Sequence, residues 1–456
     1  MATATETTAS RTNLVRDLGA SQAISIVVGV VIGSGIFLVP AEMIQAAGSA
    51  RLVYLAWIVG GIFSFFGAVT YAELGAMKPQ AGGEYVYIRD AYGPLAGFLT
   101  GWTWTIIVKP TSLAAISIGI VRLLANFPSL AFLSRRIGNI PIAEGQLVAM
   151  GFVIFVSAVN YVGVRRAGNF QLAFTILKIV LIVAISALAF SAHGDWSHFA
   201  EHYAGATGGI AGFVAAVAAA LWAYDGWSDL NMVAEEVRNP ERNIPLALVG
   251  GLLMIAALYM LVNAAVQYAL SPTLVAQSAS PMADAVRTSF LGIGAAVVVS
   301  AAMVISLTTT LNGVAMSGAR MAFALARDGN FFSALAKVHP KFHTPNVAIV
   351  VQAILSVGFL LIGGTFRQLF TLAIFAEWLS YVAASGSLFV FKKKMPAPER
   401  RSHWWGYPIA PAFFIVASAA LLYYTFTSNL KYSALGSLVI LAGIPVYYGF
   451  ALRRKL

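Results

Sequence analysis

Long apolar runs alternate with short polar stretches along most of the 456-residue chain. Each run has about twenty residues or more, which is the length that an α-helix needs to cross about 30 Å of hydrocarbon. The pattern therefore predicts an all-α membrane protein with twelve transmembrane helices. They are expected at residues 18–46, 50–77, 94–123, 143–162, 169–191, 208–235, 243–270, 290–326, 345–363, 366–391, 409–427 and 432–451.

Composition narrows the class of protein. Hydrophobic residues make up 59% of the chain and charged residues 10%, whereas a soluble domain carries about 25% charged residues. The chain has no cysteine, which excludes disulfides and thiolate metal sites, and its six histidines are too scattered for a metal motif. No nucleotide-binding loop or Ser/His/Asp grouping supports an enzyme, so we expect neither catalysis nor a cofactor.

Positive charge is distributed unevenly among the predicted loops. With the N-terminus in the cytoplasm, most lysines and arginines fall on the inner side, in agreement with the positive-inside rule. The anionic inner leaflet then accounts for the net charge of +11 without a nucleic-acid partner. We predict a multi-pass protein of the plasma membrane, in contact with lipid and with both termini cytoplasmic. Residues 1–17 are polar and rich in Thr and Ala, which is typical of a disordered tail.

The first predicted helix is interrupted at its centre by Gly33, Ser34 and Gly35. A glycine costs a helix about 1 kcal/mol relative to alanine, and Pro40 follows closely. A broken helix survives in lipid only where it is buried in protein or lines a wet cavity. The free N–H groups at such a break can bind an anion, so we interpret this break as the binding site of a carboxylate. The alternative is that the glycines only allow close helix packing.

A second interruption occurs at residues 221–227, with the sequence LWAYDGW, where an alanine-rich helix meets an aspartate and a glycine. Two broken helices that open two blocks of five spans, in opposite senses, are typical of an inverted-repeat transporter. We predict a first repeat at 18–191, a second at 208–391, and two additional helices at 409–451.

Four stretches resemble the amino acid–polyamine–organocation superfamily, and most closely its L-type amino acid transporter branch. They are GSGIF at 33–37; PQAGGEYVY at 79–87 with GPLAGF at 93–98; LWAYDGW at 221–227 continuing to EEVRNPERNIP at 235–245; and NG at 312–313 with SGAR at 317–320. The resemblance implies a leucine-transporter-type fold, with 5 + 5 inverted repeats plus two helices. It also implies sodium-independent amino acid transport, often exchange, by alternating access.

The same resemblance bears on partners. In the eukaryotic branch a cysteine between helices 3 and 4 joins the transporter to a single-span glycoprotein. Because this chain has no cysteine, we expect a stand-alone carrier with no disulfide-linked heavy chain. Assembly into homo-oligomers stays open.

An amino acid zwitterion needs one binding site for its carboxylate and another for its ammonium, and the two breaks can supply them. The N–H groups of Ser34 and Gly35, with the Ser34 hydroxyl, are expected to hold the carboxylate, while main-chain carbonyls of both breaks hold the ammonium. Trp222 is expected to act as the gate that the resemblance places over the substrate from outside; the alternative is an aromatic that fills the core. The predicted substrate-binding residues are Val31, Ile32, Gly33, Ser34, Gly35, Trp222, Tyr224, Asp225 and Gly226.

Asp225 lies in the middle of a predicted span, where an ionised carboxylate is expensive and usually functional. One hypothesis is that it receives the cationic side chain of arginine or lysine. Another is that it takes up a proton and couples transport to the proton gradient. A third is an ion pair with an interior lysine.

Lys178 lies near the centre of the predicted helix at 169–191, about 15 Å from either end. Its side chain cannot extend that far, so it must face the interior. The resemblance implies that its ammonium replaces sodium between helices 1 and 8, where it bridges helix 1 carbonyls and the hydroxyl of Thr308, Thr309 or Thr310. The alternative is a carboxylate pair needed for folding alone.

Lys109 and Glu377 complete the predicted interior charges, and Asp229 follows Asp225 by about one helical turn. Either Asp225 or Glu377 could carry a proton, since burial favours the neutral form of a carboxylate. The sequence therefore predicts a sodium-independent exchanger of neutral and, through Asp225, cationic L-amino acids. The alternatives are a proton-coupled symporter and an arginine or polyamine antiporter.

Overall fold

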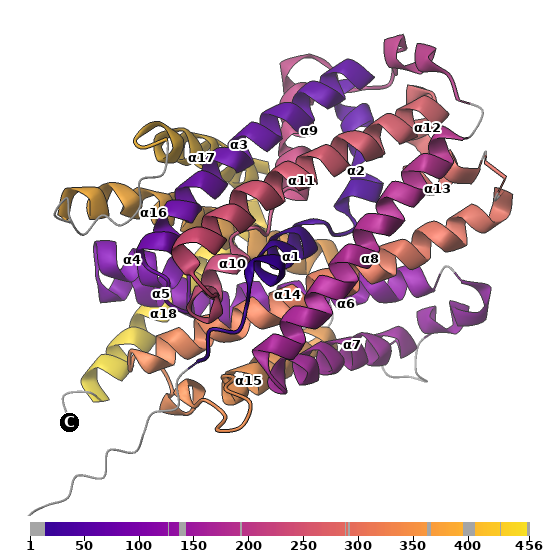
Figure 1. The fold of residues 1–456 in the computed structure, drawn as a ribbon. Coiled ribbons are helices and arrows are strands. Elements are labelled where there is room, and N and C mark those ends of the chain that lie inside the picture. Colours follow the sequence, from indigo (N-terminus) through magenta and orange to yellow (C-terminus); the bar gives the residue numbers. More distant parts are fainter. Residues whose placement is uncertain are drawn as a thin grey trace, which may run out of the picture.

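The structure is a computed structural model, and it describes residues 14–125, 127–135, 143–191, 194–287, 289–290, 292–362, 366–394, 406–428 and 430–453. These residues are almost entirely helical (Figure 1). Their extended pairings are two isolated bridges, Leu18 with Val237 and Ser49 with His202.

Eighteen α-helices are present in the described part of the chain. They are α1 (Ala20–Val31), α2 (Gly35–Ala47), α3 (Ala50–Met77), α4 (Glu84–Tyr92), α5 (Pro94–Thr103), α6 (Lys109–Leu124), α7 (Glu144–Tyr161), α8 (Val164–Phe190), α9 (Gly209–Ala223), α10 (Asp229–Met232), α11 (Pro240–Ala269), α12 (Pro272–Gln277), α13 (Pro281–Arg287), α14 (Ala295–Arg327), α15 (Asn346–Ile362), α16 (Phe366–Lys394), α17 (Ile409–Ser428) and α18 (Leu430–Arg453). A π-helix at Trp104–Val108 joins α5 to α6.

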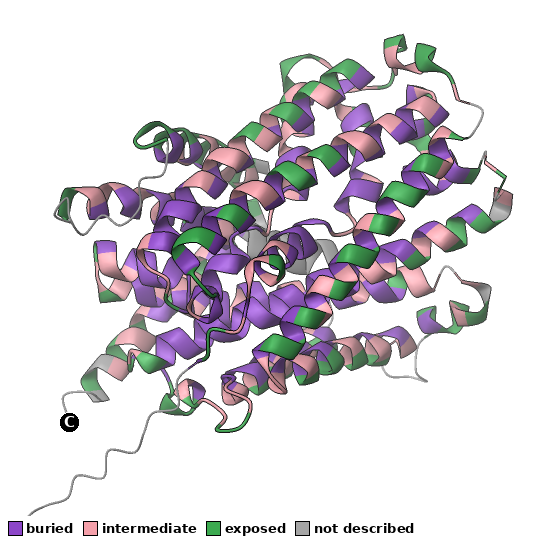
Figure 2. Cartoon of the chain, viewed as in Figure 1, coloured by how far each residue is buried: buried purple, intermediate pink, exposed green. Residues whose placement is uncertain are grey.

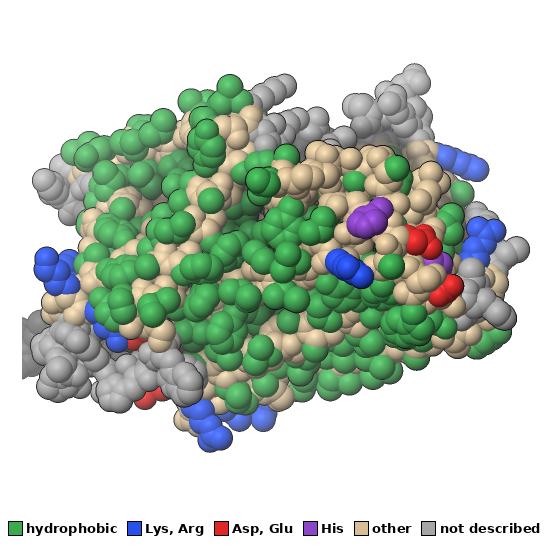
Figure 3. All heavy atoms as spheres, turned by 90° about the horizontal axis from the view of Figure 1, so that it is seen from above, with side chains coloured by type: hydrophobic (Ala, Val, Ile, Leu, Met, Phe, Trp, Pro, Cys, Tyr) green, Lys and Arg blue, Asp and Glu red, His purple; other side chains and the backbone are tan. Residues whose placement is uncertain are grey.

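Eight helical stretches of the described residues are long and apolar enough to cross a membrane. A ninth is added if α1 and α2, which are bent by 41° at their break, count as one span. α9 and α15 are apolar but shorter. Figure 3 shows the surface that such spans require, with hydrophobic side chains across the middle and most charged ones toward the two ends. The predicted all-α membrane class is thus confirmed, whereas the count of twelve is not established.

α1 lies at the centre of the bundle, where α8, α11 and α14 pack around it (Figure 1). α2 packs instead against α9, so the two halves of the first broken helix have different neighbours. α14 is the most deeply buried long helix, and nearly all of its residues from Ser306 to Ala326 are shielded from solvent. Figure 2 shows this buried centre and the exposed outer faces of α8 and α11. The division into two repeats of five spans remains a prediction.

The segment before α1 is packed on the loop after α10. Leu14 is buried, and Arg238 donates hydrogen bonds to the Arg16 carbonyl and the Asp17 carboxylate. The Leu18 N–H donates to the Glu236 carbonyl over 2.9 Å. Residues 14–17 therefore do not belong to the predicted disordered tail, because they have partners on the folded core. Residues 1–13 of that tail lie outside the described residues.

Candidate functional site

The first helix breaks where the sequence predicts it. α1 ends at Val31 and α2 begins at Gly35. Between them the Gly33 N–H bonds to the Val31 carbonyl, which is too close in sequence for an α-helical hydrogen bond. The first N–H groups of an α-helix have no intrahelical partners, so the start of α2 presents free donors at this point.

The second break lies between α9, which ends at Ala223, and α10, which begins at Asp229. Gly226 permits the turn because its φ of 109° lies in a region that side-chain-bearing residues avoid. A Cβ on Gly226 would also lie 2.8 Å from Val30 Cγ1, and one on Gly35 would lie 3.3 Å from Trp222 Cζ3. The two breaks therefore touch each other, and glycine allows the close approach on both sides.

A cavity of about 110 Å³ lies between the two breaks, α6, α14 and α16. It is lined by Val30, Val31, Gly33, Ser34, Gly35, Val108, Lys109, Ser112, Ile116, Trp222, Ala223, Asp225, Gly226, Asp229, Leu307, Thr310, Val314 and Glu377. Seven of the nine predicted substrate residues are among them. The other two are Ile32 and Tyr224. The Tyr224 ring turns away and packs edge-on against Trp57.

Tyr259 of α11 connects the two breaks. Its hydroxyl is 2.7 Å from the Ala223 carbonyl and 3.3 Å from the Val31 carbonyl, so it donates to the last residues of α9 and α1. The residue is buried. Sequence reasoning missed Tyr259, since nothing in an apolar helix marks one tyrosine as the neighbour of two distant carbonyls.

The buried ammonium of Lys178 lies directly behind the first break. It donates to the carbonyls of Ile32 at 2.6 Å, Gly29 at 2.9 Å and Ser306 at 3.2 Å. The Ser306 hydroxyl also donates to the Ile32 carbonyl, at 2.8 Å. Lys178 forms none of the ion pairs found among the described residues, so main-chain oxygens compensate its charge.

Of the three threonines predicted near Lys178, Thr310 takes part in this cluster. Its hydroxyl lies 3.1 Å from the Gly29 carbonyl and 3.4 Å from that of Ile32. The hydroxyls of Thr308 and Thr309 instead donate to carbonyls one turn earlier in α14. Ser306 occupies the place expected for one of them, because it lies one turn before Thr310 on the same face of the helix.

The same cluster bears on one predicted contact, that of the Ile32 carbonyl. The Ile32 carbonyl accepts hydrogen bonds from the Lys178 ammonium and the Ser306 hydroxyl, which occupy its two lone pairs. It therefore cannot also hold a substrate ammonium in this conformation. Val31 lines the cavity, and its carbonyl likewise accepts from two donors, the Gly33 N–H at 2.9 Å and the Tyr259 hydroxyl at 3.3 Å.

Two carboxylates at the cavity share one hydroxyl. Tyr381 of α16 donates toward Asp225 at 2.8 Å and toward Glu377 at 3.2 Å. It also shares a hydrogen bond of 3.1 Å with the Ser228 hydroxyl. Asp225 is thus bonded to a tyrosine rather than paired with an interior lysine.

Lys109 is paired with Asp229, and both residues line the cavity. The Ser317 hydroxyl donates to the other oxygen of Asp229 at 2.8 Å, and the Lys109 ammonium lies 5.0 Å from the centre of the Trp104 ring. The pair at Lys109 stabilises the contact of α6 with α10 and α14.

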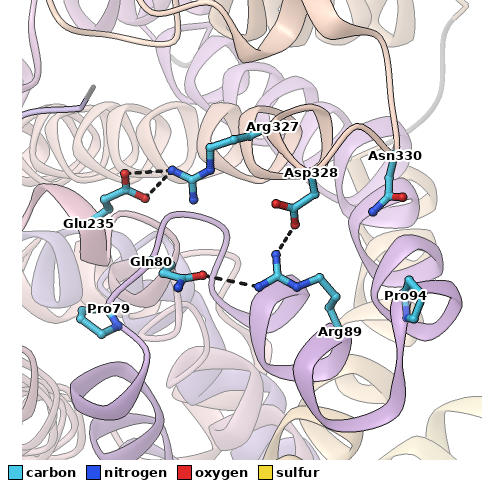
Figure 4. A pocket seen from close by; sticks show the side chains of 8 residues that line it. All are labelled: Pro79, Gln80, Arg89, Pro94, Glu235, Arg327, Asp328 and Asn330. Carbon is cyan, nitrogen blue, oxygen red and sulfur yellow. Dashed lines mark hydrogen bonds and ion pairs between the residues drawn. The ribbon is translucent and has the colours of Figure 1, made fainter. Parts of the chain in front are cut away.

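A second, larger pocket of about 750 Å³ opens where α4 meets the end of α14 (Figure 4). Two ion pairs flank it, Arg89 with Asp328 and Arg327 with Glu235. Gln80 accepts a further hydrogen bond from Arg89. The Arg89 pair fastens α4 to the end of α14, and the Arg327 pair fastens that end to the segment after α10.

The chain is similar to known proteins along most of its length. The model of the amino acid permease family matches residues 18–451. The serine/threonine exchanger SteT of Bacillus subtilis is 32% identical over 446 residues, which cover 97% of this chain and 98% of the relative. The human b(0,+)-type amino acid transporter 1 is 32% identical over 379 residues, or 81% of this chain and 74% of the relative. The human cystine/glutamate transporter is 28% identical over 453 residues, with 98% and 87% covered.

Proposed function

The chain belongs to the amino acid permease family, in the L-type branch of its superfamily, and we propose that it exchanges neutral and cationic L-amino acids without sodium. It is an amino acid transporter and not an enzyme. The observation that supports the proposed mode of binding is the cavity between the two broken helices, which touch at Gly35 and Gly226.

The substrate carboxylate binds at the start of α2. There the free N–H groups of Ser34 and Gly35 and the partial positive charge of the helix N-terminus favour an anion. The Ser34 hydroxyl faces the same cavity. The ammonium binds near the last residues of α9, where the partial charge of the helix C-terminus is negative.

The substrate side chain extends toward Asp225 and Glu377. Both carboxyl groups line the cavity, and Tyr381 holds both in place. A guanidinium or ammonium on the substrate can replace the tyrosine as the partner of Asp225. We therefore propose that Asp225 favours arginine and lysine, while a neutral side chain leaves the Tyr381 contact intact.

Sodium is not needed because Lys178 already supplies a positive charge to the carbonyls of the first break. Main-chain carbonyls are the oxygens that a hard cation would otherwise bind. Three of them accept from the Lys178 ammonium. Trp222, at the end of α9, lines the cavity and is proposed to gate it during alternating access.

The test is uptake by purified protein in liposomes. A panel of labelled amino acids is offered with and without unlabelled amino acid inside, and with sodium or choline outside. We expect internal substrate to accelerate uptake and sodium to have no effect. Uptake that is unchanged by internal substrate would contradict exchange, and stimulation by sodium would contradict the role of Lys178.

A second candidate is transport coupled to protons, either as symport or as arginine or polyamine antiport. This candidate is favoured by Asp225 and Glu377, which are both hydrogen-bonded to the Tyr381 hydroxyl. Two carboxyl groups this close do not both ionise readily, so one of them is suited to carry a proton. A pH gradient across the same liposomes separates the candidates: it drives net accumulation only if protons move with the substrate.

We propose that the protein acts in the plasma membrane as a stand-alone carrier, with both termini cytoplasmic. The lack of cysteine supports a carrier without a disulfide-linked partner. It also allows the orientation of the termini to be tested directly, because a single introduced cysteine would be the one thiol in the chain. A single cysteine introduced at Lys393 should be labelled by an impermeant maleimide only in inside-out vesicles. Labelling in intact cells would reverse the orientation. Migration of the purified protein in detergent reports whether it is a homo-oligomer.

A further inference from the structure

Glu84, at the start of α4, is a buried acid to which the transport scheme above assigns no role. Its side chain is 0% exposed, and neither carboxyl oxygen has a hydrogen-bond partner of good geometry among the described residues, although the N–H of its own backbone and the Ser228 hydroxyl lie close enough to interact with it. The hydroxyl of Tyr71, on α3, faces it and is likewise without such a partner. A buried carboxylate without hydrogen bonds costs several kcal/mol, so the uncharged carboxyl form fits this site.

The polar groups that interact with Glu84 come from α3, α4, α6, α16 and the second break. They are Tyr71 of α3, Tyr87 of α4, Lys109 of α6, Ser228 and Asp229 at the second break, and Glu377 and Tyr381 of α16. Among them Lys109 is the one cation, and it is paired with Asp229. Burial raises the pKa of the Glu84 carboxyl to about 7, although hydrogen bonding by its own backbone, the charge of Lys109 and the Ser228 hydroxyl partly offset the effect.

Glu84 also lies between the two pockets. On one side Ser228 faces it, and the Ser228 hydroxyl is bonded to Tyr381, which reaches Asp225 in the substrate cavity. On the other side of α4, Arg89 lines the surface pocket of Figure 4. Residues five apart on an α-helix are separated by about 140° around its axis, so the helix presents Glu84 and Arg89 to different sides.

From this arrangement we propose that Glu84 is a proton-binding site that couples amino acid transport to protons, through Ser228 and Tyr381 on the cavity side. This rests on the proposed transport of amino acids through the cavity. When Glu84 is protonated, Lys109 pairs with Asp229 as observed. When the carboxyl O–H bond breaks, the proton passes to water or to the hydroxyl relay, and the new carboxylate competes with Asp229 for Lys109. The Lys109–Asp229 pair lines the cavity, so proton binding and substrate binding influence each other.

The experiment uses the full-length protein in liposomes with a pH-sensitive dye inside. An inward gradient of about one pH unit should drive up to about tenfold accumulation of substrate, since one proton per substrate contributes a factor of ten per unit. The dye should report acidification when amino acid is added. We expect Glu84→Gln to retain exchange of labelled for unlabelled substrate but to lose both the accumulation and the dye signal.

Two variants complete the test. Glu84→Asp keeps an acid at the site and should retain part of the accumulation, and Glu42→Gln makes the same chemical change on an exposed residue of α2 and should retain all of it. Acidification and accumulation by Glu84→Gln at the unmodified level would overturn the inference. Exchange by the unmodified protein with no proton movement would do the same. Absence of any exchange would instead refute the proposed function.

Discussion

Replacing Lys178 by methionine tests how the first break is held. The change keeps the length of the side chain and removes the ammonium that donates to the carbonyls of Gly29, Ile32 and Ser306. The hydroxyls of Ser306 and Thr310 still reach those carbonyls, so the helix break keeps part of its hydrogen bonding. We therefore expect the variant to fold and to reach the membrane.

The expected loss can be worked from these contacts. A hydrogen bond to a charged group contributes about 1.5–3 kcal/mol, and the remaining hydroxyls leave roughly one such bond uncompensated. That energy corresponds to about 10- to 150-fold in an equilibrium constant. If the break must keep its shape to bind substrate, the exchange rate at limiting substrate should fall by about this factor.

The assay compares exchange of labelled substrate by Lys178→Met, Lys178→Arg and Lys393→Met in liposomes. Lys393 is exposed, so its variant removes the same charge without touching the break. Lys178→Arg keeps the charge, but its planar guanidinium fits the three carbonyls poorly, and we expect an intermediate rate. Exchange by Lys178→Met within twofold of the unmodified protein would refute the reasoning.

Three further predictions follow from the same site. Gly35→Val should abolish uptake while the protein still folds, because even a Cβ there would lie 3.3 Å from the Trp222 ring; normal uptake would exclude a carboxylate site at this turn. Asp225→Ala should reduce arginine uptake at least about tenfold more than leucine uptake, as the loss of a charge-assisted contact predicts, and equal losses would contradict its selective role. Thr310→Val should lower exchange about 2- to 10-fold, the value of one neutral hydrogen bond, whereas Thr309→Val should leave it unchanged; equal rates in the two variants would show that the contacts to α1 do not matter.

The elements of this fold were predictable because they depend on local patterns. Helix α3 begins and ends at the residues expected from its apolar run, and the first break coincides with Gly33 and Gly35. The burial of Lys178 followed from its distance to either end of the helix and is confirmed. Such features need only helix geometry and the thickness of the bilayer.

The partners of these residues could not be read from the sequence, because they depend on how helices rotate against one another. A rotation of 100° per residue decides that Thr310, and not Thr309, reaches α1. Tyr259 and Tyr381 look like ordinary aromatic residues of apolar helices until the breaks are brought beside them. The pairing of Lys109 with Asp229 likewise required the packing of α6 against α10 and α14.

Tyr259 has a consequence for movement at the centre of the protein. One hydroxyl hydrogen serves both the Val31 and the Ala223 carbonyl, so the two broken helices are linked by a single neutral hydrogen bond. Breaking this hydrogen bond costs about 0.5–1.5 kcal/mol, which is close to the thermal energy. Tyr259 therefore adds little resistance to a relative movement of the two broken helices, and the close packing at Gly226 and Gly35 is what such a movement has to overcome.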